Sequence, residues 1–271
     1  MDEGLSGHAF WRALYEYVDE YAGDALAGDL VRLLEGRPEE VADIRQAGLP
    51  SAHRVSYEVK RRADGYTRLE RLYAVSRILD LLLLGFQDGP EDGELPPLEA
   101  YASFCAALGA RKIGGMGFHP FFHEVVEVRQ AEDPGEAPTI VGERWPGYML
   151  GSMLLARSGV VVRAGARHLV AGVADRSTLY WTFRRRSRDT NDLSHGWGHN
   201  SQWATDFRRD YMVDGFLHYN VDAALAAEEP DEPELDPAAT VQMVRHRCST
   251  TVDHGADLWP YDDHHVEPVP G

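Results

Sequence analysis

Residues 98–130 have the sequence LEAYASFCAALGARKIGGMGFHPFFHEVVEVRQ and contain the point at which the chain changes from helix to sheet. The part up to Gly109 is predicted to be a helix that ends at this glycine. From about Phe121 onward the residues are mainly β-branched or aromatic and are separated by turn residues, a pattern typical of strands. This stretch therefore predicts an α+β protein, with helices before it and a sheet after it.

The residues before this stretch show helical periodicity. The strongest pattern is YTRLERLYAVSRILDLLLLGF at 66–86, where apolar side chains recur at spacings of three and four along one stripe. Residues 8–35 show the same spacing, and Gly23 and Gly28 are expected to divide them into shorter helices. A further helix is expected to begin at Pro38, which suits a first helical turn. Together these segments predict a small N-terminal helical bundle.

The residues after this stretch contain short runs typical of strands, among them TIVGER, YMLGSMLLA, GVVVRAG and STLYWTFR. Asp133-Pro134-Gly135 and Ser158-Gly159 are expected to be hairpin connections between them. The pattern predicts that the bundle packs on a mainly antiparallel sheet or an open barrel.

Four segments are expected along the chain. The helical portion, 1–110, and the β-rich portion, 111–227, are predicted to form one compact domain. The stretch EEPDEPELDP at 228–237 is acidic and Pro-rich, cannot bury apolar area, and is predicted to be a linker. Residues 238–271 are expected to form a C-terminal segment with an extended tail that folds back onto the body.

Charge and composition limit the partners. The 271-residue chain has a formal net charge of −17, so its field repels polyanions and disfavours extended nucleic acid and anionic membranes as partners. The longest apolar run, Leu79 to Phe86, falls far short of the roughly 20 residues that a membrane-spanning helix needs. Two cysteines and an acidic N-terminus without a secretory pattern indicate a soluble cytoplasmic protein.

A first candidate site is GFHPFFHEVVEV, in which His119 and His123 are four residues apart. On a helix this spacing would place both imidazoles on one face. If the segment is instead a loop leading into a strand, His123 and Glu127 would share a face by the period of two. Either arrangement predicts two or three ligands for one metal ion. The alternative is that both histidines are hydrogen-bonded residues near the core.

A second candidate is DTNDLSHGWGHNSQWATDFRRDY at 189–211. This stretch has no apolar periodicity, and the glycines beside His195 and His199 predict a shaped loop. Loops held on a rigid scaffold are where binding and catalytic residues concentrate. The expected roles are metal ligation by the two histidines, contacts to a substrate by Trp197, Asn200, Gln202 and Trp203, and binding of a substrate anion by Arg208 and Arg209.

The same arginines also have a structural interpretation. Arg208 and Arg209 lie between Asp206 and Asp210, and the four residues can form an ion-pair cluster that holds the loop. Asp206 is alternatively the partner that orients a catalytic histidine.

Three further features allow two interpretations each. His218 in FLHYNVD is either another imidazole at the site or a core histidine. Cys248 is either a nucleophile activated by His254 or an inert residue. The basic run FRRRSR at 183–188 is either an exposed strand end or an anion contact.

Several motifs are absent from the sequence. It lacks a phosphate-binding P-loop, a dinucleotide-type glycine pattern, HExxH, a CxxC pair and a GxSxG elbow. These absences disfavour nucleotide hydrolysis, nicotinamide chemistry, the common zinc proteases and the serine hydrolases.

The leading hypothesis is a metal-dependent enzyme that acts on a small molecule or peptide. Its ligands would be His119, His123, His195 and His199, and Glu127 would be a further ligand or the base. A mainly imidazole site suits zinc, which indicates hydrolysis, or iron or copper, which indicates oxygen chemistry. One alternative is a metal-free enzyme in which one of these histidines is the general acid/base and Asp206 or Glu127 orients it. Another is a non-catalytic module with a Trp/Arg-lined pocket for a ligand or partner.

Overall fold

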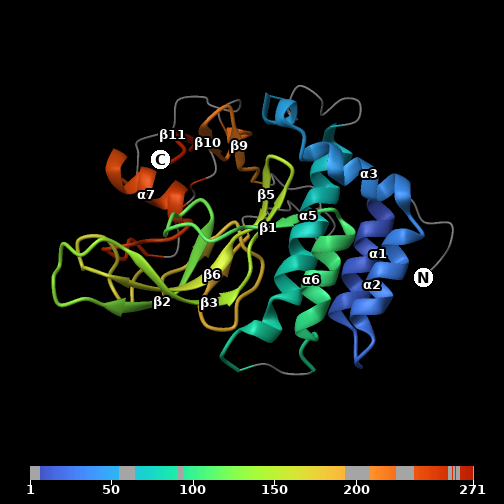
Figure 1. Ribbon diagram of the computed structural model, residues 1–271, viewed down its shortest axis with the longest axis horizontal. Helices are drawn as coiled ribbons and strands as arrows, with labels where there is room; N and C mark the ends of the chain where they lie inside the picture. The colour runs from blue at the N-terminus through green and yellow to red at the C-terminus, as the bar shows by residue number, and fades with distance from the viewer. Residues whose placement is uncertain are drawn as a thin grey trace.

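The computed structural model describes residues 7–54, 65–90, 94–192, 208–223, 235–255, 258, 260 and 263–270. A helical part, formed by the chain up to residue 107, and a sheet part lie side by side (Figure 1). The α+β class predicted from the sequence is confirmed.

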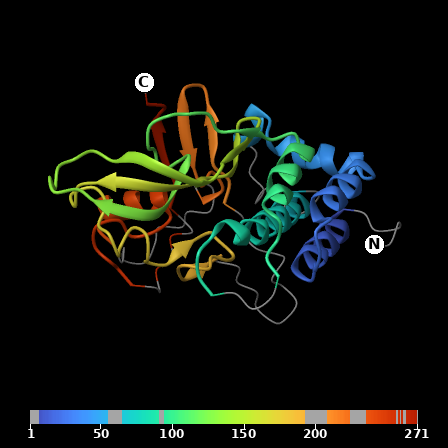
Figure 2. The same cartoon turned by 60° about the horizontal axis from the view of Figure 1, so that its bottom comes forward.

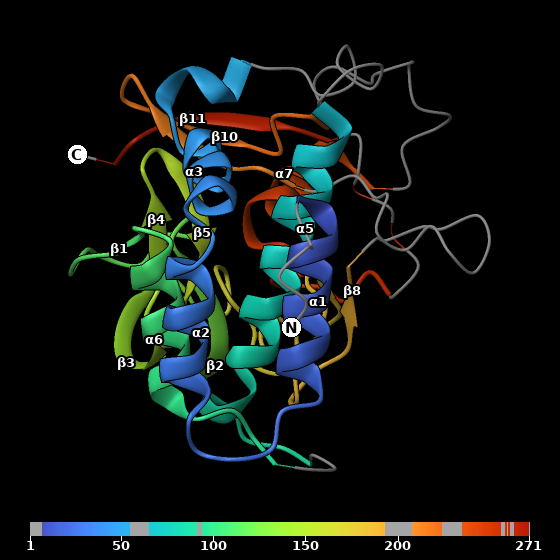
Figure 3. The ribbon, with the colours of Figure 1, turned by 90° about the vertical axis from the view of Figure 1, so that its right-hand side faces the viewer.

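The helical part begins with segments whose apolar residues follow the predicted spacing. In α2, for example, Leu26, Leu30 and Leu34 are buried along one side. Helix α1 packs against α5, α2 packs against α6, and Figure 3 shows these helices in front of the sheets. The elements are α1 (His8–Asp19), α2 (Leu26–Glu35), α3 (Pro38–Ala47), η1 (Pro50–Arg54), α5 (Gly65–Leu82), η2 (Leu84–Phe86) and α6 (Leu98–Ala107).

The glycines of the N-terminal segment divide it differently from the prediction. Gly23 lies in the break between α1 and α2 with a φ of 131°, which favours glycine. Gly28 lies inside α2, so the expectation that it also divides the segment is wrong. α3 begins at Pro38, as predicted.

The described residues of the sheet part form three sheets, and none of these closes into a barrel. Their strand orders are β1-β4-β5-β9-β10-β11, β2-β6-β3 and β7-β8. Most pairs are antiparallel, as predicted, but β2 with β6 and β7 with β8 are parallel. The strands are β1 (Arg111–Lys112), β2 (His123–Gln130), β3 (Thr139–Trp145), β4 (Tyr148–Leu150), β5 (Met153–Ala156), β6 (Ser158–Ala164), β7 (Leu179–Tyr180), β8 (Thr190–Asn191), β9 (Tyr211–Val213), β10 (Phe216–Tyr219) and β11 (His265–Pro268).

Neither of the two expected hairpin turns joins paired strands. The turn at 133–135 connects β2 to β3, and these two strands flank β6 instead of pairing with each other. Ser158 and Gly159 belong to β6. Gly159 serves close packing here, because a Cβ at this position would collide with the ring of Trp145. The connection from β5 to β6 is the single residue Arg157.

The C-terminal segment packs onto the body of the protein. Asp236 caps α7 (Pro237–His246) by accepting hydrogen bonds from the backbone N–H groups of Ala238 and Ala239. The last two residues of the predicted linker therefore begin this helix, while residues 224–234 lie outside the described residues. Strand β11 pairs with β10, so the tail adds an edge strand to the larger sheet. In the described part of the chain, no helix is long and apolar enough to cross a membrane.

Candidate functional site

A cavity lies where the helical part meets the sheet part. It has a volume of about 60 Å³, room for roughly four water molecules. Figure 2 shows the short β7–β8 segment, in yellow-orange, next to the end of α5. The lining residues are Tyr73, Ser76, Leu79, Asp80, Leu83, Glu124, Leu154, Leu155, Ala156, Arg157, Trp181, Thr182, Phe183, Arg185, Asp192, Arg208 and Arg247.

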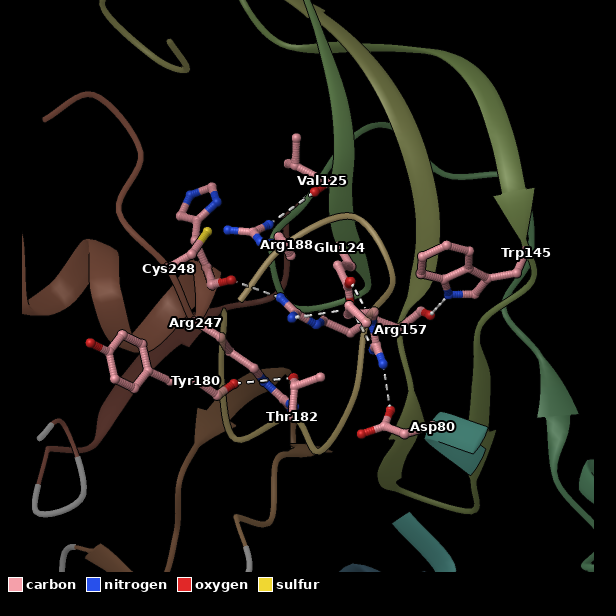
Figure 4. Close-up of polar contacts among 12 residues, drawn as sticks. Asp80, Glu124, Val125, Trp145, Arg157, Tyr180, Thr182, Arg188, Arg247 and Cys248 are labelled. Carbon is pink, nitrogen blue, oxygen red and sulfur yellow. Dashed lines mark hydrogen bonds and ion pairs between the residues drawn. The ribbon is translucent and has the colours of Figure 1, made fainter. Parts of the chain in front are cut away.

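One wall of the cavity is held by a buried ion-pair cluster around Arg185. Its Nε and Nη2 donate to the two carboxylate oxygens of Glu124 at 2.8 and 2.9 Å, and its Nη1 donates to Asp80 at 2.7 Å. The backbone N–H of Phe183 donates to the other Asp80 oxygen at 2.7 Å. These contacts join α5, β2 and the segment before β8 (Figure 4).

The two carboxylates of this cluster differ electrostatically. Burial alone would raise the pKa of Glu124, but the two-point contact with Arg185 outweighs it and lowers the pKa to about 2. Burial raises the pKa of Asp80, because its contact with Arg185 is weaker than that burial effect. Glu124 is therefore the firmly charged member of the pair.

The basic run at 183–188 is a structural link rather than an exposed strand end. The Arg185 side chain is only 6% exposed. Arg186 donates to the backbone carbonyls of Leu84, Gln87 and Gly89, and Arg188 donates to the carbonyl of Ser177. The run ties the β-rich part to the end of α5, and Arg185 also reaches the cavity.

Three other arginines that line the cavity each have a buried N–H group without a hydrogen-bond acceptor among the described residues. Arg157 Nη1 donates to the backbone carbonyl of His246 at 2.9 Å, and Arg208 donates to Asp210 at 2.8 Å. Arg247 Nη2 also donates to Asp210, at 2.9 Å. Among the described residues, however, Arg157 Nη2, Arg208 Nη1 and Arg247 Nε are buried without a hydrogen-bond acceptor. The nearest carboxylate to Arg157 Nη2 is Glu124, at 3.7 Å.

These three guanidinium groups are close enough to repel one another, and burial further disfavours their positive charges. Burial lowers the pKa of Arg157 to about 9, and the charges of Arg247 and Arg208 contribute to the shift. Burial also lowers the pKa of Arg208 to about 10, with Asp210 opposing this effect and Arg247 adding to it. An anion in the cavity would supply both the missing acceptors and a compensating charge.

The backbone beside these arginines is strained. Four non-glycine residues of the described chain have a positive φ, and two of them, Trp181 at 51° and Arg247 at 64°, line the cavity. A hydrogen bond of 2.8 Å from the Tyr180 N–H to the Arg247 carbonyl joins the two segments. The Arg208 guanidinium lies 4.4 Å from the centre of the Trp181 ring. Residues in such conformations concentrate at functional sites.

The histidines of the first candidate site lie in a turn before β2. His123 is buried, and its Nδ1 lies 3.0 Å from both the backbone N and the backbone O of His119. His119 Nε2 lies 3.5 Å from a carboxylate oxygen of Glu267. Phe118 stacks on His123 with ring centres 5.9 Å apart. This arrangement corresponds to the alternative of hydrogen-bonded histidines near the core.

Glu127 does not lie beside these histidines. The pairing of β2 with β6 has a register shift between Val125 and Glu127, so the alternation that would have placed His123 and Glu127 on one face is interrupted. The Glu127 carboxylate lies at the surface and pairs with Arg129 at 3.1 Å and Arg144 at 3.0 Å. The expectation of a shared face is therefore wrong.

The other two histidines of the metal hypothesis, His195 and His199, lie outside the described residues. Within the described ranges, no group of three His, Cys, Asp or Glu side chains is arranged to hold a metal ion. The predicted site residues that lie outside the described residues are His195, Trp197, His199, Asn200, Gln202, Trp203 and Asp206.

The metal hypothesis therefore stays a prediction, which elemental analysis checks directly. Inductively coupled plasma mass spectrometry of untagged protein is expected to find zinc, iron or copper near one equivalent, and a His119→Ala, His195→Ala double variant is expected to lose it. Protein that holds no metal and takes up none of the three on reconstitution would exclude the hypothesis.

Neighbouring Arg208 and Arg209, both predicted to bind substrate, have different environments. Arg208 lines the cavity. Arg209 is fully buried and donates to both oxygens of Asp222, at 2.7 and 2.6 Å, and to the backbone carbonyl of Ala52 at 3.0 Å. Asp222 lies outside the predicted ion-pair cluster, whereas Arg208 pairs with Asp210 at 2.8 Å, as that alternative predicts, and also lines the cavity.

The remaining candidates lie away from the cavity. The ring of His218 lies 5.0 Å from that of His53. Cys248 is buried and its thiol donates to the carbonyl of Ala174 at 3.5 Å, while His254 is exposed. Neither His218 nor Cys248 lines the cavity. These contacts favour the inert interpretation of Cys248.

Five charged residues of the cavity were not among the predicted site residues, namely Asp80, Glu124, Arg157, Asp192 and Arg247. Two of them carry a signal in the sequence. Asp80 interrupts the apolar run of α5, and Arg157 lies between two runs of apolar strand residues. A charged residue inside a buried segment requires a partner, and such positions often belong to a site.

No protein-family model matches the chain, and neither the search of curated proteins nor that of solved structures finds a match.

Proposed function

We propose that the protein binds a small anionic ligand, free or at the end of a peptide, in the cavity formed by Arg157, Arg208 and Arg247. The observation that carries this proposal is the three buried N–H groups of these arginines, which have no acceptor among the described residues. A buried donor without an acceptor costs about 1–3 kcal/mol. A ligand that accepts these hydrogen bonds would recover that cost.

Unlike these arginines, the carboxylates that line the cavity have hydrogen-bond partners within the protein. Asp80 and Glu124 both accept hydrogen bonds from the guanidinium of Arg185, and Asp192 accepts one from Arg77 at 2.6 Å. Each lining carboxylate thus already has a positive partner, whereas three guanidinium groups keep a donor unused. The cavity therefore favours an anion over a cation.

The ligand would be recognised at short range. The protein as a whole carries a charge of −17, which repels anions in solution. Affinity must then come from hydrogen bonds and charges inside the cavity, where low polarity strengthens both. Arginine suits this role, because its planar group binds carboxylates and phosphates by two parallel hydrogen bonds.

Isothermal titration calorimetry tests the proposal with acetate and inorganic phosphate as probes in a chloride-free buffer. At least one of them is expected to bind at one site per chain, with a dissociation constant on the order of 1 mM for so small a ligand. Arg247→Met is expected to weaken this binding at least about tenfold, because it removes one charged donor.

A matched control is Arg245→Met, which changes an arginine two residues away. Arg245 pairs with Glu267 at 3.1 Å and does not line the cavity, so its replacement is expected to leave anion binding unchanged. Failure of both probes to bind, or equal losses in the two variants, would refute the proposed site.

A further inference from the structure

We infer that the natural ligand is an organic monocarboxylate with an apolar body and no ammonium group, such as a short branched-chain or aromatic acid. This inference rests on the proposed anion-binding function and specifies its ligand. Its basis is the lining of the cavity, which combines arginines with apolar side chains.

The apolar wall is formed by side chains from three segments. α5 contributes Leu79 and Leu83, β5 contributes Leu154, and the segment after β7 contributes Trp181 and Phe183. The cavity thus presents apolar side chains as well as arginines to a ligand. A ligand that fills it would place its body against these side chains, and the burial of apolar surface would add to its affinity.

The polar groups on this wall have partners within the protein. The Ser76 hydroxyl donates to the carbonyl of Tyr73 at 2.7 Å, and the Thr182 hydroxyl donates to the carbonyl of Tyr180 at 3.2 Å. Their protons are thus unavailable to a polar ligand body. An apolar body suits this surface better than a sugar or a polyol.

A ligand ammonium group would lack a partner of its own. It would have to compete with arginines for Asp80, Glu124 or Asp192, because each of these carboxylates already accepts a hydrogen bond from an arginine. A buried cation without a partner is strongly disfavoured. The cavity should therefore reject a zwitterionic amino acid whose carbon skeleton matches that of a bound acid.

The charges of the cavity indicate a single negative charge on the ligand. Among the described residues, four arginines line it, against three carboxylates. The nearest partners of these residues, Asp210 beside Arg208 and Arg77 beside Asp192, cancel each other. The excess is one positive charge, which one carboxylate neutralises.

The test compares ligands on one unchanged protein, so no variant has to fold. Calorimetry with 3-methylbutanoate, valine, acetate and inorganic phosphate separates the contributions. 3-Methylbutanoate is expected to bind at least about tenfold more tightly than acetate, because its isopropyl group becomes buried. It is also expected to bind at least about tenfold more tightly than valine, which has the same skeleton and an added ammonium group.

The possible outcomes distinguish this inference from the proposed function. Equal affinity for valine and 3-methylbutanoate, or tighter binding of phosphate than of any carboxylate, would overturn the inference and leave an anion site in place. If none of the four ligands binds, the proposed function itself is wrong. An affinity order of 3-methylbutanoate above acetate and valine would support both.

Discussion

Replacing Arg185 by methionine is expected to lower the free energy of unfolding by about 3–5 kcal/mol. The Arg185 side chain is 6% exposed, and its guanidinium is the shared partner of Asp80 and Glu124. Methionine has a similar length but no charge, so two buried carboxylates would lose their principal counter-charge. For Glu124, Arg157 would remain at 3.7 Å, without a hydrogen bond, and would compensate only in part.

Chemical denaturation followed by circular dichroism measures this loss. The matched control is Arg144→Met, which removes a surface ion pair with Glu127 and is expected to cost less than about 1 kcal/mol. Adding Asp80→Asn and Glu124→Gln to Arg185→Met is expected to recover part of the loss, because the unpaired charges disappear. A loss no larger than that of Arg144→Met would show that this buried cluster does not stabilise the fold.

The sequence predicts the helices well, because each buries one stripe of apolar residues. The register of 66–86 identifies Leu72, Leu79 and Leu82 as core residues, and all three are buried. The strands are identified by composition, but their order is not. The parallel pairing of β2 with β6 and the place of β3 depend on contacts between distant segments, which local patterns do not encode.

The candidate site is harder to predict, because its residues come from segments far apart in the chain. Arg185 and Asp80 are 105 residues apart, and Arg157 and His246 are 89 apart. The metal hypothesis was based on histidines because they are close to one another in the sequence. The arginines that surround the cavity are scattered through the chain, and only the fold brings them together.

Arg208 and Arg209 show that the sequence does not predict the roles of single residues. Both were predicted to bind substrate, and the alternative was an ion-pair cluster. Neighbouring side chains in extended backbone point to opposite sides, so one arginine contacts the cavity and the other contacts Asp222. Arg208 also pairs with Asp210, as the ion-pair alternative predicts, whereas Asp222, the partner of Arg209, lies outside the predicted cluster. Binding of a substrate anion by Arg208 stays a prediction.

Replacing Arg157 by methionine is expected to weaken binding of an anion at least about 30-fold while leaving the fold as stable as before, within about 1 kcal/mol, or more stable. This outcome is the opposite of that for Arg185, although both arginines line the same cavity. Burial and the neighbouring arginines lower the pKa of Arg157 to about 9, so its surroundings within the protein disfavour its positive charge. Burial opposes the charge of Arg185 too, but Asp80 and Glu124 outweigh it and raise the pKa.

Two effects of Arg157→Met on stability oppose each other. The His246 carbonyl loses the donor that lies 2.9 Å away, which costs about 1–3 kcal/mol if no water replaces it. The variant also relieves the repulsion from Arg247 and Arg208, and Glu124 keeps its two hydrogen bonds to Arg185. Because these terms are of similar size, little net change is expected. A site that holds uncompensated charge for a ligand gives up stability in this way, and replacing such a residue exchanges function for stability.

Denaturation and calorimetry on the same preparation measure the two effects together. The expected pattern is lost binding of 3-methylbutanoate or acetate with an unfolding free energy at or above that of the unchanged protein. A loss of more than about 3 kcal/mol, similar to that of Arg185→Met, would mean that Arg157 is a structural ion-pair partner like Arg185. Unchanged binding in a stable variant would instead show that the anion does not contact Arg157, and the site proposed at the three arginines would be wrong in that part.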